Sequence, residues 1–360
     1  MGVYIWGKQY YSYGNGPIAG PVSFAASQGF HTVRLAMSPR SSMDYGLSGS
    51  CDSGLTLTQM AQESQFEQAF ANPDISTFIL TTYDHTTFGD CSTLKFLNPS
   101  FYTTANTAAV EQEYKDLTMY LYQTYHGTGK TFILSNWEGD NQLYCDNAYG
   151  YATNAAAKAS CDQNYATYYD GNQNVGVSIQ GMKDWLEARS AGIAAGRAAA
   201  AAQGLSGVSV YSAAELNIVR ALHDNGYASM LYDVLPGLPL DYVLYSSYES
   251  INNANPGQTL AQDIATIENV AGTRNVIIGE FGYNQLQVPS STADTYLQQI
   301  VSTVQNAGLP YAVAWQLFDQ PAGEGDFGLY GLNGQPELVN GITQGYNGSG
   351  AGNNIMAQTP

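Results

Sequence analysis

The sequence predicts an α/β protein with one large domain, a (β/α)8 or TIM barrel with long loops at its C-terminal face. Eight short runs rich in Val, Ile, Leu, Tyr and Thr alternate with segments of helical character. The apolar runs are nearly continuous, as in parallel strands that are buried on both faces. Two of them end in glutamates, Glu138 and Glu280, which places both carboxylates at the C-terminal rim, where barrel enzymes have their active sites.

The predicted strands are runs bounded by turn residues. They cover 3–9, 32–38, 77–84, 131–138, 208–213, 242–248, 275–280 and 311–318. The predicted helices cover 18–28, 58–70, 105–125, 179–203, 216–234, 260–271 and 292–306. A doubly wound open sheet is the alternative. Its signals are weak, because Gly14 and Gly16 fit a dinucleotide-binding turn only loosely and the run 33–38 ends without the expected acid.

The chain is longer than a barrel requires. It has 360 residues against ~250 in a typical barrel, so about a hundred residues must form insertions. Three long stretches, 39–57, 85–104 and 139–174, follow predicted strands, and we expect them to wall one cleft. The catalytic domain is predicted to span 1–345. The Gly/Asn/Ser-rich segment 346–360 is predicted to be a flexible tail or a clipped linker.

Composition restricts the partners of this chain. Charged residues make up 12% of it, about half the usual share, and the formal net charge is -18. Such a surface repels polyanions, so nucleic acid is not expected as a partner. No apolar run approaches the ~20 residues of a membrane span, so no membrane partner is expected either. Neutral sugars suit an uncharged polar surface, although an acidic extracellular habitat alone also explains the composition.

The four cysteines predict two disulfides. None lies in a CxxC spacing, which argues against a zinc site or a thioredoxin motif. Cys51 and Cys91 follow neighbouring predicted strands, and Cys145 and Cys161 share the stretch 139–174. We therefore expect the pairs Cys51–Cys91 and Cys145–Cys161, and with them a secreted protein, whereas four unrelated thiols are the alternative. No signal peptide precedes the first predicted strand, so we expect a mature form.

Several kinds of chemistry are excluded by their missing motifs. The four histidines show no HxH or HExxH spacing, so no metal site is expected. A GxSxG elbow is absent, and the segment 129–131 lacks the upstream glycine of a phosphate-binding loop. No cofactor is implied. Carboxylate chemistry remains, and a pair of Asp or Glu residues flanking the bond to be cut is how most glycosidases work.

Short motifs at three predicted strand ends resemble clan A, the large group of (β/α)8 retaining glycoside hydrolases that includes cellulases and mannanases. They are Asn-Trp-Glu at 136–138, Ile-Gly-Glu-Phe-Gly at 278–282 and Ala-Trp-Gln at 314–316, with a similar turn at 325–336. The resemblance implies that Glu138 is the acid/base, Glu280 the nucleophile and Trp315 the floor under the reacting sugar. It also implies that Arg34 and Tyr248 hydrogen-bond the nucleophile.

The chain departs from the clan pattern at two positions. The clan usually has Asn directly before its acid/base, whereas here Trp137 intervenes. Strand alternation points Asn136 and Glu138 to one side, so Asn136 is the candidate substrate-binding residue in place of that Asn, with a geometry that differs from the usual one. Ser246 stands where the clan often has His. The family within the clan is therefore not identified.

Other residues at the predicted strand ends are further candidates. Asp140 and Glu215 are alternative acids, and Glu249 is an alternative acid or nucleophile. Trp6, Tyr83, Trp137 and Tyr283 are expected to stack on sugars, and His85 is a candidate subsite residue, with core packing as the rival role.

The sequence thus predicts a secreted, monomeric, retaining β-glycoside hydrolase that cuts within the chains of a neutral polysaccharide, a β-glucan or a β-mannan. The alternatives are a carbohydrate-binding barrel without turnover, an exo-acting enzyme and an inverting glycosidase.

Overall fold

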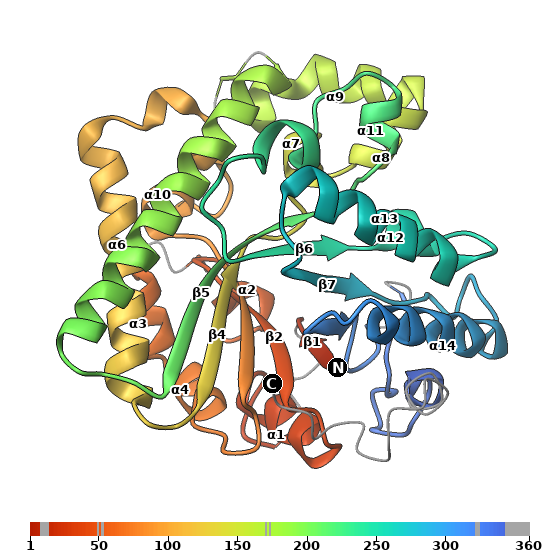
Figure 1. Cartoon of the computed structure of the whole chain (residues 1–360), viewed down its shortest axis with the longest axis horizontal. Coiled ribbons are helices and arrows are strands. Elements are labelled where there is room, and N and C mark those ends of the chain that lie inside the picture. Colours follow the sequence, from red (N-terminus) through yellow and green to blue (C-terminus); the bar gives the residue numbers. More distant parts are fainter. Residues whose placement is uncertain are drawn as a thin grey trace.

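The computed structural model describes residues 1–7, 14–48, 50–51, 54–169, 171–172, 174–320 and 325–342. Eight parallel strands in these ranges form a closed barrel in chain order, and β1 closes it by pairing with β8 (Figure 1). The strands are β1 (Gly2–Ile5), β2 (Thr32–Met37), β3 (Thr77–Thr82), β4 (Lys130–Ser135), β5 (Val208–Leu216), β6 (Tyr242–Ser246), β7 (Val276–Phe281) and β8 (Ala312–Ala314). The predicted (β/α)8 TIM barrel is confirmed.

Helices surround the barrel and follow most of its strands (Figure 1). The longer ones are α1 (Ala19–Ser27), α6 (Thr104–Tyr125), α9 (Ala155–Tyr168), α10 (Val175–Ala202), α13 (Pro256–Ala271) and α14 (Ser290–Asn306). The shorter ones are α2 (Ser41–Asp44), α3 (Leu57–Ala61), α4 (Ser64–Phe70), α5 (His85–Phe88), α7 (Gly139–Leu143), α8 (Ala148–Thr153), α11 (Ala221–Asp224) and α12 (Tyr248–Ile251). Two 3-10 turns, η2 (Lys95–Leu97) and η3 (Pro99–Phe101), and a π-helical turn, η4 (Met230–Val234), complete the set.

Two apolar cores explain why the strands are apolar along their whole length. Successive side chains of a strand point to opposite faces. Ile79, Ile133 and Leu244 point inward and fill the barrel, while Phe78 and Phe132 point outward and pack under the helices. The two phenylalanine rings stack with centroids 5.5 Å apart. Burial on both faces is what parallel strands in a barrel require.

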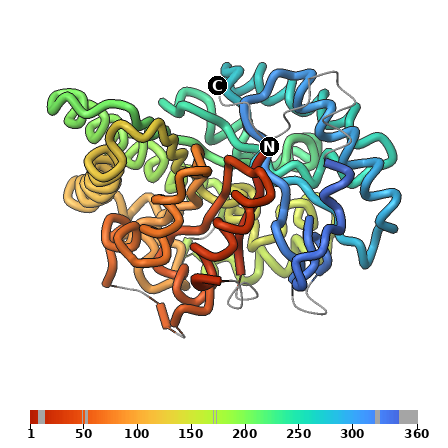
Figure 2. The backbone as a smooth tube through the Cα atoms, turned by 90° about the horizontal axis from the view of Figure 1, so that it is seen from below, coloured from red at the N-terminus to blue at the C-terminus, as the bar shows by residue number. Residues whose placement is uncertain are grey.

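The helices α6 and α10 pack closely against each other because α10 carries glycines at the contact. A Cβ atom on Gly192 would lie 2.3 Å from the carbonyl oxygen of Glu111, and one on Gly196 would lie 2.6 Å from Cβ of Thr118. The first of these distances would force the two helix backbones apart. The barrel closes between the two ends of the chain. In Figure 2 the beginning of the chain, in red, lies beside its last segments, in blue, as the pairing of β1 with β8 requires.

The structure differs from the predicted elements most clearly after β5. The segment 216–234 was predicted to be a helix, and this prediction is wrong, because β5 continues to Leu216 and only α11 and η4 follow. The Ala-Ala-Glu-Leu end of β5 pairs with β6 from Ala213 to Leu216, so sheet pairing overrides its helical propensity. Gly226, with a φ of 75°, then ends the helical turns of α11. As a consequence Glu215 lies within the barrel wall.

Smaller differences concern the insertions and the end of the chain. The predicted helix 58–70 is broken into α3 and α4, and the stretch 139–174 contains α7, α8 and α9. The predicted tail 346–360 lies outside the described residues. None of the helices in the described ranges combines the length and apolarity that a membrane span requires.

Candidate active site

A cavity of about 900 Å³ lies at the C-terminal ends of the strands. Most of its inner lining comes from residues at or just after the ends of seven strands, namely Trp6, Ser38, Tyr83, Trp137, Glu138, Tyr248, Glu280 and Trp315. Both predicted catalytic glutamates are therefore brought to one cavity, together with five of the predicted sugar-binding aromatic residues.

Glu280 lies near the end of β7 and is 3% exposed. Its Oε2 accepts a hydrogen bond from the Tyr248 hydroxyl at 3.5 Å, and its Oε1 lies 3.4 Å from Nη1 of Arg34. Among the described residues no donor hydrogen-bonds Oε1. Burial raises the pKa of Glu280 above its usual range, while the Arg34 charge acts in the opposite direction.

Glu138 follows β4 and has a left-handed backbone with a φ of 30°. Its backbone N–H donates to Oε2 of Glu215 at 3.0 Å, and its own Oε2 accepts from the Asn141 amide at 2.5 Å. Burial, and then the charge of Glu215, raise the pKa of Glu138 to about 8. A carboxyl group with this pKa keeps its proton at neutral pH, as a general acid must.

Asn136, a predicted substrate-binding residue, does not line the cavity. Its side chain bridges to β5, where Oδ1 accepts from the Glu215 N–H at 2.9 Å and Nδ2 donates to the Glu215 carbonyl oxygen at 3.1 Å. The alternation argument fails because β4 ends at Ser135 and the backbone turns left-handed at Glu138. Asn136 thus joins two strands instead of lining the cavity.

Arg34 and Glu215 form a buried ion pair beneath the two glutamates, and the sequence analysis missed its importance. Both side chains are fully buried, and Arg34 Nη1 and Nη2 donate to the two carboxylate oxygens at 2.6 and 2.7 Å. The guanidinium also donates to Thr81 Oγ1 and to the carbonyl oxygen of Gly279. Its pKa is raised, because the nearby carboxylates outweigh the opposing effect of burial.

The aromatic lining is built from both sides of the β1–β8 seam and from the β3–β4 edge. Trp6 and Trp315 lie with ring centroids 5.8 Å apart, and Tyr4 meets Trp315 edge-on at 4.8 Å. On the opposite wall the ring of Tyr83 stacks flat on Trp185 of α10 at 5.4 Å. The Tyr83 hydroxyl accepts from the Trp137 N–H at 2.8 Å. These rings offer apolar faces beside the carboxyl groups.

Two predicted sugar-binding residues do not line the cavity. His85 is the first residue of α5, and its Nδ1 lies 3.6 Å from a Glu113 oxygen, because Asp84 caps that helix and turns it toward α6. Tyr283 donates its hydroxyl to the Ile251 carbonyl oxygen at 2.7 Å. Its backbone is directed there by Gly282, which passes so close to Trp315 that a Cβ would lie 2.2 Å from the carbonyl oxygen.

The alternative acids Asp140 and Glu249 also point elsewhere. Asp140 is fully buried and accepts the backbone N–H groups of Asn217, Ile218 and Met230. Glu249 accepts those of Val219, Arg220 and Ala221. Both carboxylates therefore fix the chain after β5, and neither lines the cavity.

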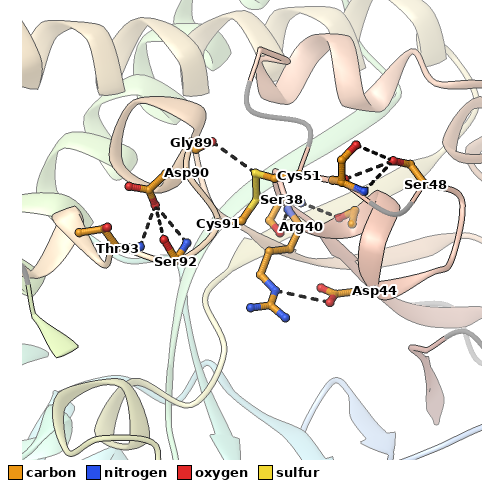
Figure 3. Close-up of a disulfide and its surroundings, with 12 residues drawn as sticks. Ser38, Arg40, Asp44, Ser48, Cys51, Gly89, Asp90, Cys91, Ser92 and Thr93 are labelled. Atoms are coloured by element: carbon orange, nitrogen blue, oxygen red, sulfur yellow. Dashed lines mark hydrogen bonds and ion pairs between the residues drawn. A yellow bond between two sulfur atoms is a disulfide. The ribbon is translucent and has the colours of Figure 1, made fainter. Parts of the chain in front are cut away.

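Both predicted disulfides are present in the structure. Cys51 and Cys91 join the segments that follow β2 and β3, with Cα atoms 6.0 Å apart. Figure 3 shows this bond beside Arg40 and Asp44, whose charged groups are 3.5 Å apart, and Cys91 itself lines the cavity. Cys145 and Cys161 join the turn after α7 to α9, with Cα atoms 5.8 Å apart.

One group of acidic residues in the described part of the chain is compact enough for a metal ion. The carboxylate oxygens of Asp319, Asp326 and Glu337 lie within 4.8 Å of one another, and none of the three residues lines the cavity. Asp319 accepts the Gly328 N–H at 2.7 Å, and burial together with its two acidic neighbours raises its pKa to about 8.

Of the comparisons with known proteins, only the one with solved structures finds proteins similar to this chain. No protein-family model matches the sequence, and a search of curated proteins finds no relative. Solved structures do match, over nearly the whole chain. The matched structures include glycoside hydrolases of family 5 (GH5), which share the (β/α)8 barrel fold with this chain.

Three GH5 structures illustrate the likeness. A variant of the GH5_18 protein from Streptomyces cattleya, in complex with Manβ1-4GlcNAc, is 10% identical, with 100% of this chain and 82% of that chain covered and a TM-score of 0.58. The GH5-4 broad-specificity endoglucanase from Clostridium longisporum is 14% identical, with 97% and 96% covered and a TM-score of 0.54. The family 5 xyloglucanase from Paenibacillus pabuli is 12% identical, with 96% and 97% covered and a TM-score of 0.53. At these identities the likeness shows a shared (β/α)8 barrel fold.

Proposed function

We propose that this protein is a retaining β-glycoside hydrolase in which Glu280 is the nucleophile and Glu138 is the acid/base. The observation that carries the proposal is the placement of two buried carboxyl groups, from the ends of β7 and β4, in one aromatic-lined cavity. Two carboxyl groups facing one bond are what glycoside hydrolysis requires. The shared barrel fold, whose matched solved structures include an endoglucanase and a xyloglucanase, supports the same reaction class.

The charges around the two carboxyl groups support the assignment of their roles. Burial raises the pKa of both groups, but Arg34 lies 3.4 Å from Glu280 and opposes the rise there, so the negative charge of the resting site is best placed on Glu280. Among the described residues Glu138 forms no ion pair, and its backbone is hydrogen-bonded to a neighbouring carboxylate, that of Glu215. Its pKa of about 8 leaves it protonated at neutral pH. An ionised nucleophile beside a protonated acid is the starting state of the double displacement.

The reaction then needs no group beyond these two. A carboxylate oxygen of Glu280 bonds to the anomeric carbon while the bond to the leaving oxygen breaks and Glu138 gives that oxygen its proton. The Glu138 carboxylate next takes a proton from a water molecule, whose oxygen bonds to the anomeric carbon and releases Glu280.

We further propose a neutral polysaccharide, a β-glucan or a β-mannan, as the substrate, cut within its chains. Trp6, Trp137 and Trp315 offer ring faces for stacking on sugars. The net charge of -18 disfavours polyanionic polymers. The cavity also reaches from the inner rim to the segments after β2 and β3, where Ser38, Arg40 and Cys91 line it, which gives room for sugars beyond the reacting one.

Two disulfides support the proposal that the protein works in an oxidising, extracellular compartment. A monomeric state and a single catalytic domain over 1–345 remain predictions.

A panel assay tests the proposal. Release of reducing ends is measured on barley β-glucan, galactomannan, xyloglucan and a uronate polymer, for the wild type and for the nearly isosteric Glu280→Gln. We expect turnover of a neutral polymer that the variant loses, a rapid fall of viscosity, and products that keep the β configuration by NMR. A carbohydrate-binding barrel would bind without releasing ends, an inverting enzyme would give α products, and an exo-acting enzyme would barely change viscosity.

A further inference from the structure

The buried pair Arg34–Glu215 carries an inference that rests on the proposed function and deepens it. We propose that Glu215 is a positioning residue for the two catalytic glutamates. It holds the Arg34 guanidinium away from full pairing with Glu280, and it places a fixed negative charge against Glu138.

The hydrogen bonds of Glu215 show that it cannot take part in the proton transfers itself. Oε1 accepts from Arg34 Nη1 at 2.6 Å and from Ser246 Oγ at 3.0 Å. Oε2 accepts from Arg34 Nη2 at 2.7 Å and from the Glu138 N–H at 3.0 Å. An ionised carboxylate has about four acceptor sites, so all of them are used. Glu215 is fully buried and does not line the cavity.

The position of Arg34 follows from this pairing. A guanidinium forms its strongest contact as a two-pronged fork on one carboxylate, and Arg34 gives that fork to Glu215. Only a longer contact of 3.4 Å remains for Glu280, whose Oε1 accepts no hydrogen bond from the described residues. A carboxylate that is not bound by a guanidinium fork keeps more of its electron density, so Glu280 is a better nucleophile than it would be with Arg34 fully paired to it.

The second effect is electrostatic and acts on Glu138. The ionisable groups that act on Glu138 from the surrounding elements are Arg34 on β2, Glu215 on β5, Tyr248 on α12 and Glu280 on β7. Of the carboxylates among them, Glu215 is the one that raises the pKa of Glu138 most. A bound substrate cannot reach the Glu215 carboxylate and pair with its charge, because Glu215 is buried below the cavity floor. A permanent negative charge there keeps the proton on the acid.

The variant Glu215→Gln tests both effects at once, because an amide keeps the shape and one acceptor oxygen but loses the charge. Carbon-13 NMR of labelled glutamate carboxyls follows the titration of Glu138 without any substrate, and Glu138→Gln assigns its signal. We expect Glu215→Gln to lower the Glu138 midpoint by about one pH unit or more. The basic limb of kcat/KM on barley β-glucan or galactomannan should move down with it, and kcat should fall about tenfold or more while KM changes little.

Asp140→Asn is the matched control, since Asp140 is an equally buried carboxylate that binds only backbone N–H groups. It should cost stability and leave the Glu138 midpoint in place. If Glu215→Gln does not fold, Glu215→Asp is measured instead. This variant keeps the charge on a shorter arm, so the midpoint should stay near the wild-type value while kcat falls.

An unmoved Glu138 midpoint in a folded Glu215→Gln would overturn the inference, as would a shifted midpoint in Glu215→Asp. These outcomes are distinct from a failure of the proposed function. If Glu280→Gln keeps its turnover, the nucleophile is assigned wrongly whatever Glu215 does. If Glu280→Gln is inactive and Glu215→Gln behaves as the wild type, only the positioning role fails.

Discussion

Tyr83 accepts a hydrogen bond from the backbone N–H of Trp137 at 2.8 Å, which ties the end of β3 to the end of β4. The same hydroxyl accepts from the Gln142 amide at 2.6 Å, and its ring lies flat on Trp185. The segment between these two contacts, from Trp137 to Gln142, contains Glu138. One buried tyrosine thus holds both ends of the turn that carries the proposed acid/base, so Tyr83 contributes to the site through its hydroxyl as well as through its ring.

Replacing this hydroxyl should weaken both the fold and the reaction. Tyr83→Phe keeps the ring stack but leaves two buried donors without their acceptor, which should lower the free energy of unfolding by about 1–3 kcal/mol. Because Glu138 loses its fixed position, kcat should also fall. Urea unfolding and steady-state kinetics measure the two effects. Tyr245→Phe is the control, since its buried hydroxyl binds Asp263 outside the cavity, and it should lose stability alone.

The nucleophile can be tested by chemical rescue. Glu280→Ala should fold and be nearly inactive, because the residue that forms the covalent bond is gone. Azide added to this variant should restore turnover of an aryl glycoside and give an α-glycosyl azide, since one displacement replaces two. NMR of the product identifies the anomer. Substantial activity without azide would assign the nucleophile to another group.

The acid role of Glu138 predicts a dependence on the leaving group. Glu138→Ala should retain much of its glycosylation rate on a dinitrophenyl glycoside, which needs little protonation, and lose it on polysaccharide. Pre-steady-state release of dinitrophenol gives the first rate and reducing-end assays give the second. Equal losses on both substrates would exclude Glu138 as the general acid.

The raised pKa of Glu138 also predicts how stability depends on pH. The ordinary glutamate value is 4.5 and the folded value is about 8. Between these pH values the folded protein keeps a proton that the unfolded chain has released, so this group makes folding less favourable as the pH rises. Glu138→Gln removes the effect. Its gain in unfolding free energy over the wild type should grow from pH 4.5 to 8, to the order of a few kcal/mol, and then level off. Urea unfolding at a series of pH values measures it, and a constant difference would contradict the raised pKa.

The disulfide that closes the longer loop should contribute more to the free energy of unfolding. The paired cysteines are 40 residues apart for Cys51–Cys91 and 16 for Cys145–Cys161. Replacing either pair by serine should cost about 2–4 kcal/mol, with the longer loop costing more in the chain-entropy account. Thermal unfolding of the two double variants gives the order. Peptide mapping without reduction checks the pairing itself, and four free thiols would contradict both the pairing and the secretion proposal.

The fold was predictable because its signals are local and repeated. Strands such as β4 and β7 are apolar on both faces and end in turn residues, and the two glutamates follow from their places at the strand ends. Glu215 was named only as an alternative acid, because Ala213-Ala214-Glu215-Leu216 has helical propensity and only its pairing with β6 makes it a strand. The left-handed backbone of Glu138 has no sequence signal either, since a glutamate does not favour that conformation. The partners of Asn136 and of Arg34 depend on both of these features.

The bond between Cys51 and Cys91 has a consequence for how this active site can be changed. Each of the two segments it joins borders the cavity, through Arg40 on the one side and Cys91 on the other. Neither can be lengthened, shortened or replaced without moving the other. For loop grafting the two segments are therefore one unit. A library that varies them independently would mostly give variants whose cavity lining is disrupted. A library that exchanges both segments together with their shared disulfide would give variants with new specificities.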